Sequence, residues 1–529
     1  NAVKKLPPEI FAFGGEKMIK KLISRRNLIA KEAMTYYRFI SQKVNVVGSN
    51  QKEYFKISNN GEGLQVRVYA REKGNDTSFI MFDRIFLPSV TREIHLYGLN
   101  DDDLFDIEEN ATSRIKIRII GGKGNDTFDI RGHVENLLYD LKTDGNYVKN
   151  KSQTKDRFSL DAPVNDRSIL GFQYNTTKLP QLHLNHNSDD GLILGAGISK
   201  RTYGFRNLPF ASDQKLSLLY AISRRAYQLN YRGEFNHITR NIDLILQGNF
   251  SNPALRNFTG LGNEPQVDKN KNFNYYLTRY RSLELEALIS KRFFERVRLM
   301  WGPYFYHYNN KFSDNVNNVL GKFRELQLDS ADIYSQKNYG GGKLAFIVDN
   351  RNKEFLPTRG MYWHTELMAL KGFTKGSNNY MRYTTDMTLH ASLSEPAKVV
   401  AVLKIGGGRI FSKNYAYFQA LTLGANNGLI GFRKNRYAGT SLLYSGLELK
   451  IKILDINSFI LPGPFGVSVF YDVGRVWVKG EHSKKWHGAY GAGLYYIPFD
   501  LFAITANAGF SGGEKMLTFT LGTKINLTY

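Results

Sequence analysis

The stretch TLGTKINLTY (Thr520–Tyr529) alternates between two kinds of residue without a break. One face is mainly apolar and consists of Leu521, Thr523, Ile525, Leu527 and Tyr529. A strand of this kind suits a sheet with lipid on one side and water on the other, and its closing aromatic ring suits the headgroup level. An antiparallel strand of a soluble sandwich alternates in the same way. This stretch alone therefore leaves both folds open.

The composition narrows the choice. The chain has 529 residues, of which 42% are hydrophobic, yet its mean hydropathy is −0.38. No run approaches the roughly 18 consecutive apolar residues that a spanning helix requires. If the chain crosses a membrane, it must do so as a closed barrel. The absence of cysteine fits a bacterial envelope compartment, where a stray thiol risks wrong disulfides.

The formal charge is +24, and a strongly basic protein can be a nucleic-acid-binding protein. The lysines and arginines are spread along the chain and alternate with apolar residues, whereas a nucleic-acid-binding segment would concentrate them. A basic lumen or contact with anionic lipid headgroups is the favoured interpretation, and we expect no nucleic-acid partner. The sequence starts at Asn1 without a basic and apolar leader, so a signal peptide or upstream domain is expected to have been removed or to lie outside this sequence.

Period-two patterns recur from about residue 180 to the end, in roughly sixteen segments separated by turns rich in Gly, Asn and Asp. Asn241–Phe250 and Ser282–Ser290 are the clearest examples. The connections after the fifth, seventh and eleventh segments are long, and several even-numbered ones are short. Outer-membrane barrels show this asymmetry, with long external loops and short periplasmic turns. The pattern predicts a 16-stranded antiparallel transmembrane β-barrel over 180–529, in the outer membrane of a Gram-negative bacterium.

Four stretches of this region resemble segments of one family: Asn257–Glu264 (NFTGLGNE), Val348–Gly360 (VDNRNKEFLPTRG), Leu421–Gly439 (LTLGANNGLIGFRKNRYAG) and Phe465–Trp477 (FGVSVFYDVGRVW). The family is the superfamily of outer-membrane assembly and secretion barrels that includes BamA, TamA and the two-partner-secretion transporters. The four stretches occur in the family's order. The third resembles the tip of the family's sixth external loop, and the fourth resembles the inward-facing motif of its thirteenth strand.

The resemblance implies a loop tip that folds back into the lumen, where an arginine pairs with carboxylates of the inner wall. The wall positions correspond to Glu448 and Asp472, but the tip lacks the family's arginine. Either Arg433 or Arg436 reaches the wall acids instead, or the loop is held differently and the acids pair with lumen lysines. We favour the first alternative, in which one of these arginines takes the place of the missing one. A solvated basic external loop is a further alternative. The candidate tip residues are Leu429, Ile430, Gly431, Phe432, Arg433 and Arg436.

The family's mechanism, as the resemblance implies it, uses a weak seam between the first and last strands, whose edge can template an incoming strand. The predicted first strand, Gln181–His186, is short and follows Pro180. A short strand of this kind would permit an openable seam, or it could simply mark a poorly defined start. The candidate seam residues are Gln181, Leu182, Leu527 and Tyr529.

The first 155 residues differ in pattern. Residues 1–50 are expected to contain an amphipathic helix or helix pair over Gly15–Val44, which packs on a neighbouring domain or, less favoured, lies on a membrane. Residues 51–155 predict a small β-rich, solenoid-like periplasmic module, and 156–179 a linker. GGKGNDTFDI (Gly121–Ile130) fits a calcium β-roll repeat, and GLNDDDLFDI (Gly98–Ile107) is a degenerate copy 23 residues earlier. The candidate calcium ligands are Asp103, Gly121, Gly122, Gly124 and Asp126.

The fold class is therefore expected to be all-β: a barrel preceded by a helix and a β-rich module. The βααββ succession of POTRA repeats is not found, and no catalytic motif is present, so no enzymatic activity is expected within this chain. The arrangement loosely resembles barrels fused to an upstream phosphoesterase, whose metal motifs are missing here.

Two functions remain open. The first is assembly, insertion or secretion of outer-membrane proteins as a divergent or accessory subunit, with lipids, assembly proteins or lipoproteins, and unfolded outer-membrane protein clients as partners. The second is a passive anchor for a periplasmic or upstream enzymatic domain. A general porin is disfavoured, because the loop tip would plug the lumen.

Overall fold

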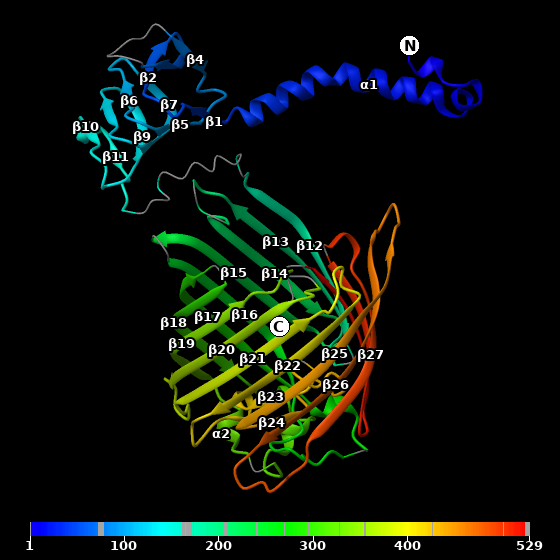
Figure 1. Cartoon of the computed structure of the whole chain (residues 1–529). Helices are drawn as coiled ribbons and strands as arrows, with labels where there is room; N and C mark the ends of the chain where they lie inside the picture. Colours follow the sequence, from blue (N-terminus) through cyan, green and yellow to red (C-terminus); the bar gives the residue numbers. More distant parts are fainter. Residues whose placement is uncertain are drawn as a thin grey trace. The chain divides into compact units, whose positions relative to one another are not determined.

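The computed structural model describes residues 2–523, apart from 72–78, 161–163, 165–171, 173, 188, 206, 208, 240–241, 269, 295, 327, 354–355, 426 and 501. The chain divides into two compact units, Asn1–Phe172 and Gln173–Tyr529. Figure 1 shows the first unit in blue and cyan and the second in green to red. Among the described residues, no helix is both long and apolar enough to cross a membrane.

The first unit begins with the helix α1 (Pro8–Ile40). Pro8 suits its first turn because proline lacks an N–H that would be unpaired there anyway. Apolar side chains recur at helical spacing along one face, yet most of them are exposed: Phe13, Met18, Leu22, Ile29 and Tyr36 among others. The sequence predicted a helix reaching Val44, but the chain leaves the helix at Ile40 and enters a strand at Lys43.

Two sheets form the rest of the first unit. One has the order β1-β5-β7-β9-β11 and is entirely parallel. The other has the order β10-β8-β6-β2-β3-β4, in which only the β2-β3-β4 end is antiparallel. The strands are β1 (Lys43–Val47), β2 (Glu53–Asn60), β3 (Gly63–Ala70), β4 (Ile80–Phe86), β5 (Glu93–Asn100), β6 (Leu104–Ile107), β7 (Thr112–Lys123), β8 (Thr127–Ile130), β9 (His133–Tyr139), β10 (Tyr147–Lys149) and β11 (Lys155–Asp156).

The 23-residue repeat seen in the sequence sets the register of these sheets. Phe105 of β6 pairs with Phe128 of β8, and Leu99 of β5 pairs with Gly122 of β7. Each repeat therefore forms one rung, and consecutive rungs stack in parallel as in a solenoid. Between the two sheets lies a core of aliphatic and aromatic side chains, which includes the stacked rings of Phe55, Phe105 and Phe128.

The second unit is a closed barrel of sixteen strands, as the sequence predicted. Each strand is antiparallel to its neighbours. The strands are β12 (Thr176–Asn187), β13 (Gly191–Thr202), β14 (Ser212–Ala221), β15 (Ala226–Thr239), β16 (Ile242–Asn257), β17 (Leu277–Phe293), β18 (Val297–Asn309), β19 (Lys337–Asp349), β20 (Gly360–Gly372), β21 (Tyr380–Ala391), β22 (Val399–Ile410), β25 (Ser441–Ile456), β26 (Gly463–Trp477), β27 (His487–Tyr496), β28 (Phe502–Ser511) and β29 (Lys515–Thr523).

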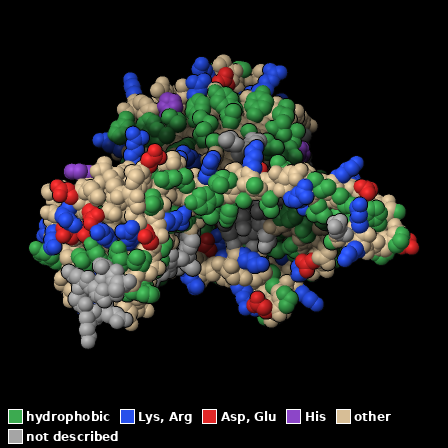
Figure 2. Space-filling view, turned by 90° about the horizontal axis from the view of Figure 1, so that it is seen from above, with side chains coloured by type: hydrophobic (Ala, Val, Ile, Leu, Met, Phe, Trp, Pro, Cys, Tyr) green, Lys and Arg blue, Asp and Glu red, His purple; other side chains and the backbone are tan. Residues whose placement is uncertain are grey.

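The alternation of each strand separates two faces. On β17, Leu285 and Ile289 are exposed on the outer face, whereas Glu284 and Glu286 point to the lumen, where Lys343 of β19 pairs with Glu286. Hydrophobic side chains therefore face outward while charged ones pair inside, which is the arrangement of a wall between lipid and water. Figure 2 shows lysine and arginine side chains scattered over the visible face among the hydrophobic ones.

The two ends of the barrel differ. At one end, which we call the loop end, lie the long connections 258–276, 310–336 and 411–440, which contain α2 (Ser330–Ile333), β23 (Leu421–Leu423) and β24 (Tyr437–Gly439) (Figure 1). The other end, the turn end, carries shorter connections such as 392–398 and 457–462. Two turn-end connections, 203–211 and 350–359, are longer than the others at that end.

The predicted first strand is corrected. It was expected to be short, over Gln181–His186, but β12 runs from Thr176 to Asn187, and Pro180 lies within it, at a register shift against β13. A proline is tolerated where the ladder is interrupted, so it did not delay the start of the strand. The barrel closes by pairing β12 with β29 from Leu184↔Leu521 to Asn187↔Thr518, which are four register pairs within the described residues. The ladder of β12 with β13 has ten.

Candidate functional site at the loop tip

The candidate site is the connection between β22 and β25, which contains the stretch that resembles the family's loop tip. Its two arms pair as the hairpin β23–β24, with Leu421 opposite Gly439 and Leu423 opposite Tyr437. The hairpin presents residues 424–436 as a compact tip, in which the N–H groups of Asn427 and Leu429 both donate to the carbonyl of Gly424. The tip is therefore an ordered element with its own backbone hydrogen bonds.

Apolar packing holds the tip against the barrel wall. Leu429 is fully buried and Phe432 is 5% exposed. They share a cluster with Tyr444 of β25, Val476 of β26 and Ala489 of β27. Burying a side chain of this size contributes about 1.5–3 kcal/mol. Two such anchors therefore offset only part of the entropy cost of ordering this segment of the loop. Polar contacts must supply the rest.

A close backbone approach brings the tip onto the last strands. A Cβ atom built on Gly509 of β28 would lie 2.7 Å from the Cα of Gly431, and one built on Gly431 would lie 2.8 Å from the Cβ of Ala489. Contacts this short leave no room for a side chain at either glycine. Gly431, which the sequence analysis selected as a tip residue, therefore lets the tip lie directly on the inner wall.

The basic residues of the tip bind acids on two different barrel turns. The Arg433 guanidinium donates to Asp189 at 3.0 Å, and the backbone N–H of Lys434 donates to the second oxygen of the same carboxylate at 2.9 Å. The Arg436 Nε donates to Glu514 at 2.7 Å, and the Arg433 backbone N–H donates to it at 3.0 Å. Asp189 is only 2% exposed, so these are partly desolvated, charge-assisted contacts of the stronger kind.

The two acids lie on opposite sides of the barrel closure. Asp189 belongs to the turn that joins β12 and β13, the first hairpin, and Asp190 beside it accepts a 2.8 Å hydrogen bond from Lys434 Nζ. Glu514 belongs to the turn that joins β28 and β29, the last hairpin. The loop tip therefore bridges the first and last hairpins across the β12–β29 seam. We call the contacts of Arg433, Lys434 and Arg436 with Asp189, Asp190 and Glu514 the clamp.

A second loop-end connection supports the clamp. Asn257 donates through its amide to the carbonyl of Lys434 at 2.9 Å, and Thr259 donates to the carbonyl of Arg436 at 2.8 Å. Asn263, fully buried, donates to Glu481 and accepts from the backbone N–H of Val476. The stretch Asn257–Glu264, chosen in the sequence for its resemblance alone, thus contacts the tip and β26 at once.

The structure selects between the alternatives left open for the wall acids. Among the described residues, neither Arg433 nor Arg436 forms a hydrogen bond or an ion pair with Glu448 or Asp472. Glu448 lies 3.7 Å from the Lys404 ammonium and 3.6 Å from that of Lys450. Asp472 accepts the backbone N–H of Ile430 at 2.9 Å. The favoured prediction, that a tip arginine pairs with the wall acids, is therefore wrong. Arg433 and Arg436 instead bind Asp189 and Glu514, and the loop is held differently from the family's pattern.

The acids of the clamp carried no signal in the sequence analysis. Asp189 and Glu514 occur in Asn-, Asp- and Gly-containing turns, where acidic residues are ordinary. Their role depends on contacts with residues 244 and 78 positions away, respectively. Only a prediction that the first and last hairpins meet at the loop end would have drawn attention to them. Of the predicted seam residues, Gln181 and Leu182 lie on β12, while Leu527 and Tyr529 lie outside the described residues.

The candidate calcium residues form a different arrangement in the first unit. The backbone N–H of Glu53 donates to Asp103 and that of Asp103 donates to Asp126, both at 2.8 Å. The N–H of Asp126 donates to the amide oxygen of Asn146 at 2.7 Å. The side chains thus form a ladder from rung to rung, with Gly121 against the Asp126 carboxylate. In the described chain, no group of three or more His, Cys, Asp or Glu residues is placed to hold a metal ion.

Comparison with known proteins gives the family. The Omp85 superfamily domain matches residues 185–498. The search of curated proteins found no match. Similar solved structures include BamA from Haemophilus ducreyi lacking POTRA domains 1–3, with 14% identity, coverage of 67% of this chain and 70% of that chain, and a TM-score of 0.48.

CdiB from Acinetobacter baumannii is 13% identical, with coverage of 67% of this chain and 60% of that chain, and a TM-score of 0.41. CdiB from Escherichia coli is 12% identical, with coverage of 66% of this chain and 63% of that chain, and a TM-score of 0.42. The chain thus spans less than two thirds of either CdiB. The family match extends from β12 to the connection after β27, and it includes the loop tip and Asp189 but ends before Glu514. With sixteen strands closed into one barrel and more than half of its length matched, the chain belongs to the Omp85 superfamily and is a barrel of the Gram-negative outer membrane.

Proposed function

We propose that the protein acts in the assembly or export of other outer-membrane proteins, with the β12–β29 seam as its working edge and the clamp as the latch of that edge. The observation that carries the proposal is the bridge from one loop tip to Asp189 on the first hairpin and Glu514 on the last. An edge that opens needs a closure that can be released, and a clamp of a few ion pairs meets that need.

The physical basis is the exposed edge that opening would create. When two paired strands separate, their N–H and C=O groups become a template for another strand. The described seam has four register pairs, fewer than the ladders on either side of it. Separating β12 from β29 also requires Arg433 to leave Asp189 or Arg436 to leave Glu514. Because each contact is partly desolvated, breaking one leaves an acid to be solvated by incoming water or by a client.

The first unit is proposed to lie in the periplasm. The three longest connections, 258–276, 310–336 and 411–440, all lie at the loop end. In outer-membrane barrels the long connections are external, so the turn end, where β12 starts, faces the periplasm. Chemical labelling of a cysteine introduced at Glu109, an exposed turn residue of the first unit, checks this. The proposal expects labelling by a membrane-impermeant maleimide only after the outer membrane is permeabilised, and labelling of intact cells would contradict it.

A disulfide across the seam tests the working edge. The chain has no cysteine, so Asn185→Cys with Thr520→Cys places the only two thiols at a register pair of the closure. Cells that depend on this variant should show lower levels of many outer-membrane proteins under oxidising conditions, and reductant should restore them. The matched control is Ser217→Cys with Asn230→Cys, a register pair between β14 and β15 that is away from the seam.

The outcomes separate the two candidate roles. If the seam disulfide forms without effect while removal of the protein still lowers outer-membrane proteins, the seam is not the working edge. If neither the disulfide nor removal changes them, and only one activity associated with the first unit is lost, the barrel is a passive anchor. The passive anchor is the second candidate function because the clamp is also compatible with a barrel that stays permanently closed.

A further inference from the structure

The helix α1 carries an apolar stripe that the first unit leaves exposed. All 33 residues of α1 are described, and Gly15 alone among them is buried. Apolar residues that are four or seven positions apart lie on one face of a helix. Such a row is 38–65% exposed and consists of Met18, Leu22, Ile29, Tyr36 and Ile40. Because an apolar surface of this extent is unfavourable in water, we expect a surface outside the first unit to cover the stripe.

Cations border the stripe on both sides. At about 100° per residue, three of them lie along one border and two along the other. The first three are Lys20, Lys31 and Arg38, and the other two are Lys21 and Arg25; all five are exposed. Over its whole length, α1 has seven lysines and arginines but three glutamates. An apolar face between two cationic borders is typical of helices that lie on anionic membrane surfaces.

The exceptions to this pattern are few. Arg26 falls within the stripe, but its guanidinium donates to the side chain of Asn27 at 3.2 and 3.3 Å. Since Asn27 lies at the polar border, this contact draws the charge away from the apolar face. Leu28 and Phe39 fall on the polar face. The separation of apolar from charged side chains therefore holds over most of α1 from Lys17 onward.

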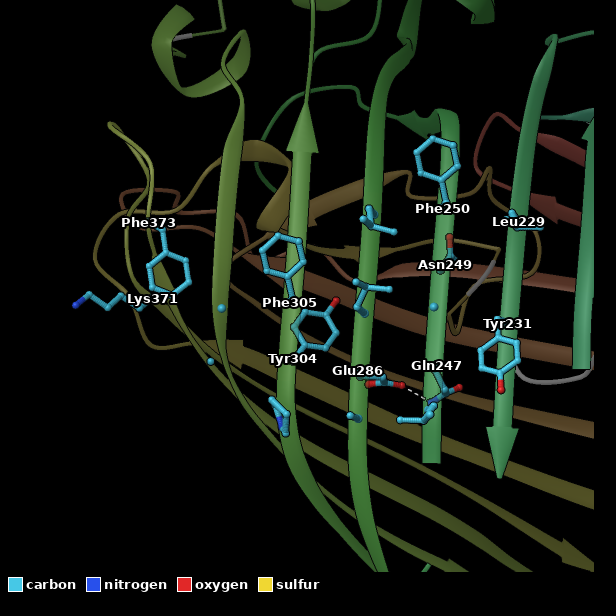
Figure 3. Close-up of a pocket in the computed structure, with 18 residues that line it drawn as sticks. Leu229, Tyr231, Gln247, Asn249, Phe250, Glu286, Tyr304, Phe305, Lys371 and Phe373 are labelled. Carbon is cyan, nitrogen blue, oxygen red and sulfur yellow. Dashed lines mark hydrogen bonds between the residues drawn. The ribbon is translucent and has the colours of Figure 1, made fainter. Parts of the chain in front are cut away.

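The barrel does not complement this helix. Residues 173–529 contain 44 lysines and arginines but 25 aspartates and glutamates, so two basic surfaces would repel each other. The apolar side chains of the barrel wall face outward, where lipid covers them. Figure 3 shows Leu229, Phe250 and Phe305 around a hollow of about 850 Å³ in this outer wall. The partner of α1 must therefore be both apolar and anionic, and a leaflet that contains anionic phospholipids has both properties.

We propose that α1 lies along the surface of a leaflet that contains anionic phospholipids, with the stripe at the boundary of the acyl chains and the bordering cations at the lipid phosphates. The chain enters the barrel at the turn end, where β12 starts, so the leaflet on that side of the same membrane is the one we assign. Burial of the stripe and attraction to the phosphates add to each other. Neither the seam nor the clamp takes part in this contact, so its failure would leave the proposed function untouched.

Fluorescence quenching by lipids tests this contact on the full chain reconstituted in vesicles. A nitrobenzoxadiazole probe on Leu22→Cys reports the stripe, and the same probe on Ser24→Cys reports the opposite face; the chain has no other thiol. The quencher is a phosphatidylcholine with a spin label near the start of its acyl chain. In vesicles that contain phosphatidylglycerol, quenching should be several-fold stronger at Leu22→Cys than at Ser24→Cys. In vesicles of phosphatidylcholine alone, this difference should largely disappear.

Charge reversal provides the matched comparison. Lys20→Glu with Lys21→Glu changes one cation on each border and should reduce quenching at Leu22→Cys several-fold, whereas Lys20→Arg with Lys21→Arg should retain it. The control is Lys142→Glu with Lys151→Glu, the same change of charge at exposed lysines after β9 and β10, which should have no effect. Equal quenching with and without phosphatidylglycerol would overturn the proposal. A blue-shifted probe at Leu22→Cys without lipid quenching would also overturn it, because a protein surface would then cover the stripe.

Discussion

At the residue scale, Glu514 is the acceptor that two parts of the tip share. Its carboxylate receives the Arg436 Nε and the Arg433 backbone N–H, and its side chain is 24% exposed. Glu514→Gln keeps the size but removes the charge, and hydrogen bonds to charged groups contribute about 1.5–3 kcal/mol. We expect hydrogen exchange of residues 430–436 to become roughly tenfold faster or more, measured by mass spectrometry on the full chain in detergent.

The control for this change is Glu395→Gln, which removes the charge of an acid that pairs with Arg359 in an exposed turn. Exchange of the tip should not respond to it, because exposed ion pairs contribute little. Asp472→Ala, which removes the acceptor of the Ile430 N–H, should accelerate exchange at the start of the tip and leave Arg436 protected. Unchanged exchange in Glu514→Gln would mean that the clamp does not hold the tip.

The carboxylate ladder of the first unit makes a pH-dependent contribution to stability. Burial, reinforced by neighbouring carboxylates, raises the pKa of Asp103 to about 9 and that of Asp126 to about 8, from 3.8. The folded state therefore binds more protons, so this contribution is complete below pH 3.8 and is lost as the pH rises toward 8 to 9. Between pH 5 and 8 each group lowers the free energy of unfolding by at most about 1.4 kcal/mol per pH unit.

Asparagine already stands at the equivalent position of the next rung, Asn146. Asp103→Asn with Asp126→Asn should therefore keep the ladder and remove its pH dependence. The measurement is the urea midpoint of the first unit in the full chain, followed by pulse proteolysis at pH 5 and pH 8. Burial lowers the pKa of His95, whose opposite slope is common to both proteins and cancels in the comparison. An equal pH dependence of variant and wild type would refute the titration of these two acids.

At the element scale, the solenoid depends on its ring stack. Phe105 of β6 lies between Phe55 and Phe128, with ring centroids 4.6 and 5.4 Å away. Phe105→Ala removes a fully buried ring from the middle of the stack and should cost about 3–5 kcal/mol of the first unit's stability. Urea denaturation followed by pulse proteolysis measures this. Phe79→Ala, at a ring that is 65% exposed, should change the same midpoint little, and equal effects would contradict the stack's role.

Strands were the elements most accessible from sequence, because period-two alternation is local. The pattern in Ser282–Ser290 predicted part of β17 and its outward face correctly. The 23-residue repeat predicted the stacking of Asp103 on Asp126, but it did not show that their oxygens accept from backbone N–H groups of neighbouring rungs. The end of α1 at Ile40 was missed because the following residues, Lys43–Val47, are recruited by a strand more than forty residues later, β5. Pairing of this kind overrides local preference.

At the scale of the whole molecule, most strands of the barrel pair with their neighbours in sequence, but its closure pairs the first strand, β12, with the last, β29. Its first and last hairpins are more than 300 residues apart in sequence, yet the tip of one loop contacts both. The sequence supplied the barrel, the strand number and the tip, but the acids that receive the tip could be identified only from the closed structure. Placing the clamp on the seam rather than on the inner wall is the main correction to the sequence-based account.

The most direct test of this closure is the distance across the seam. Spin labels at Ser223→Cys, in the second loop-end turn, and Gly512→Cys, in the last, report the separation of the two sides by pulsed electron resonance in nanodiscs. The account expects a narrow distribution in the otherwise unchanged chain. Arg433→Ala with Arg436→Ala should broaden it and shift it to longer distances. An identical narrow distribution with and without the two arginines would contradict the claim that the loop tip holds the seam closed.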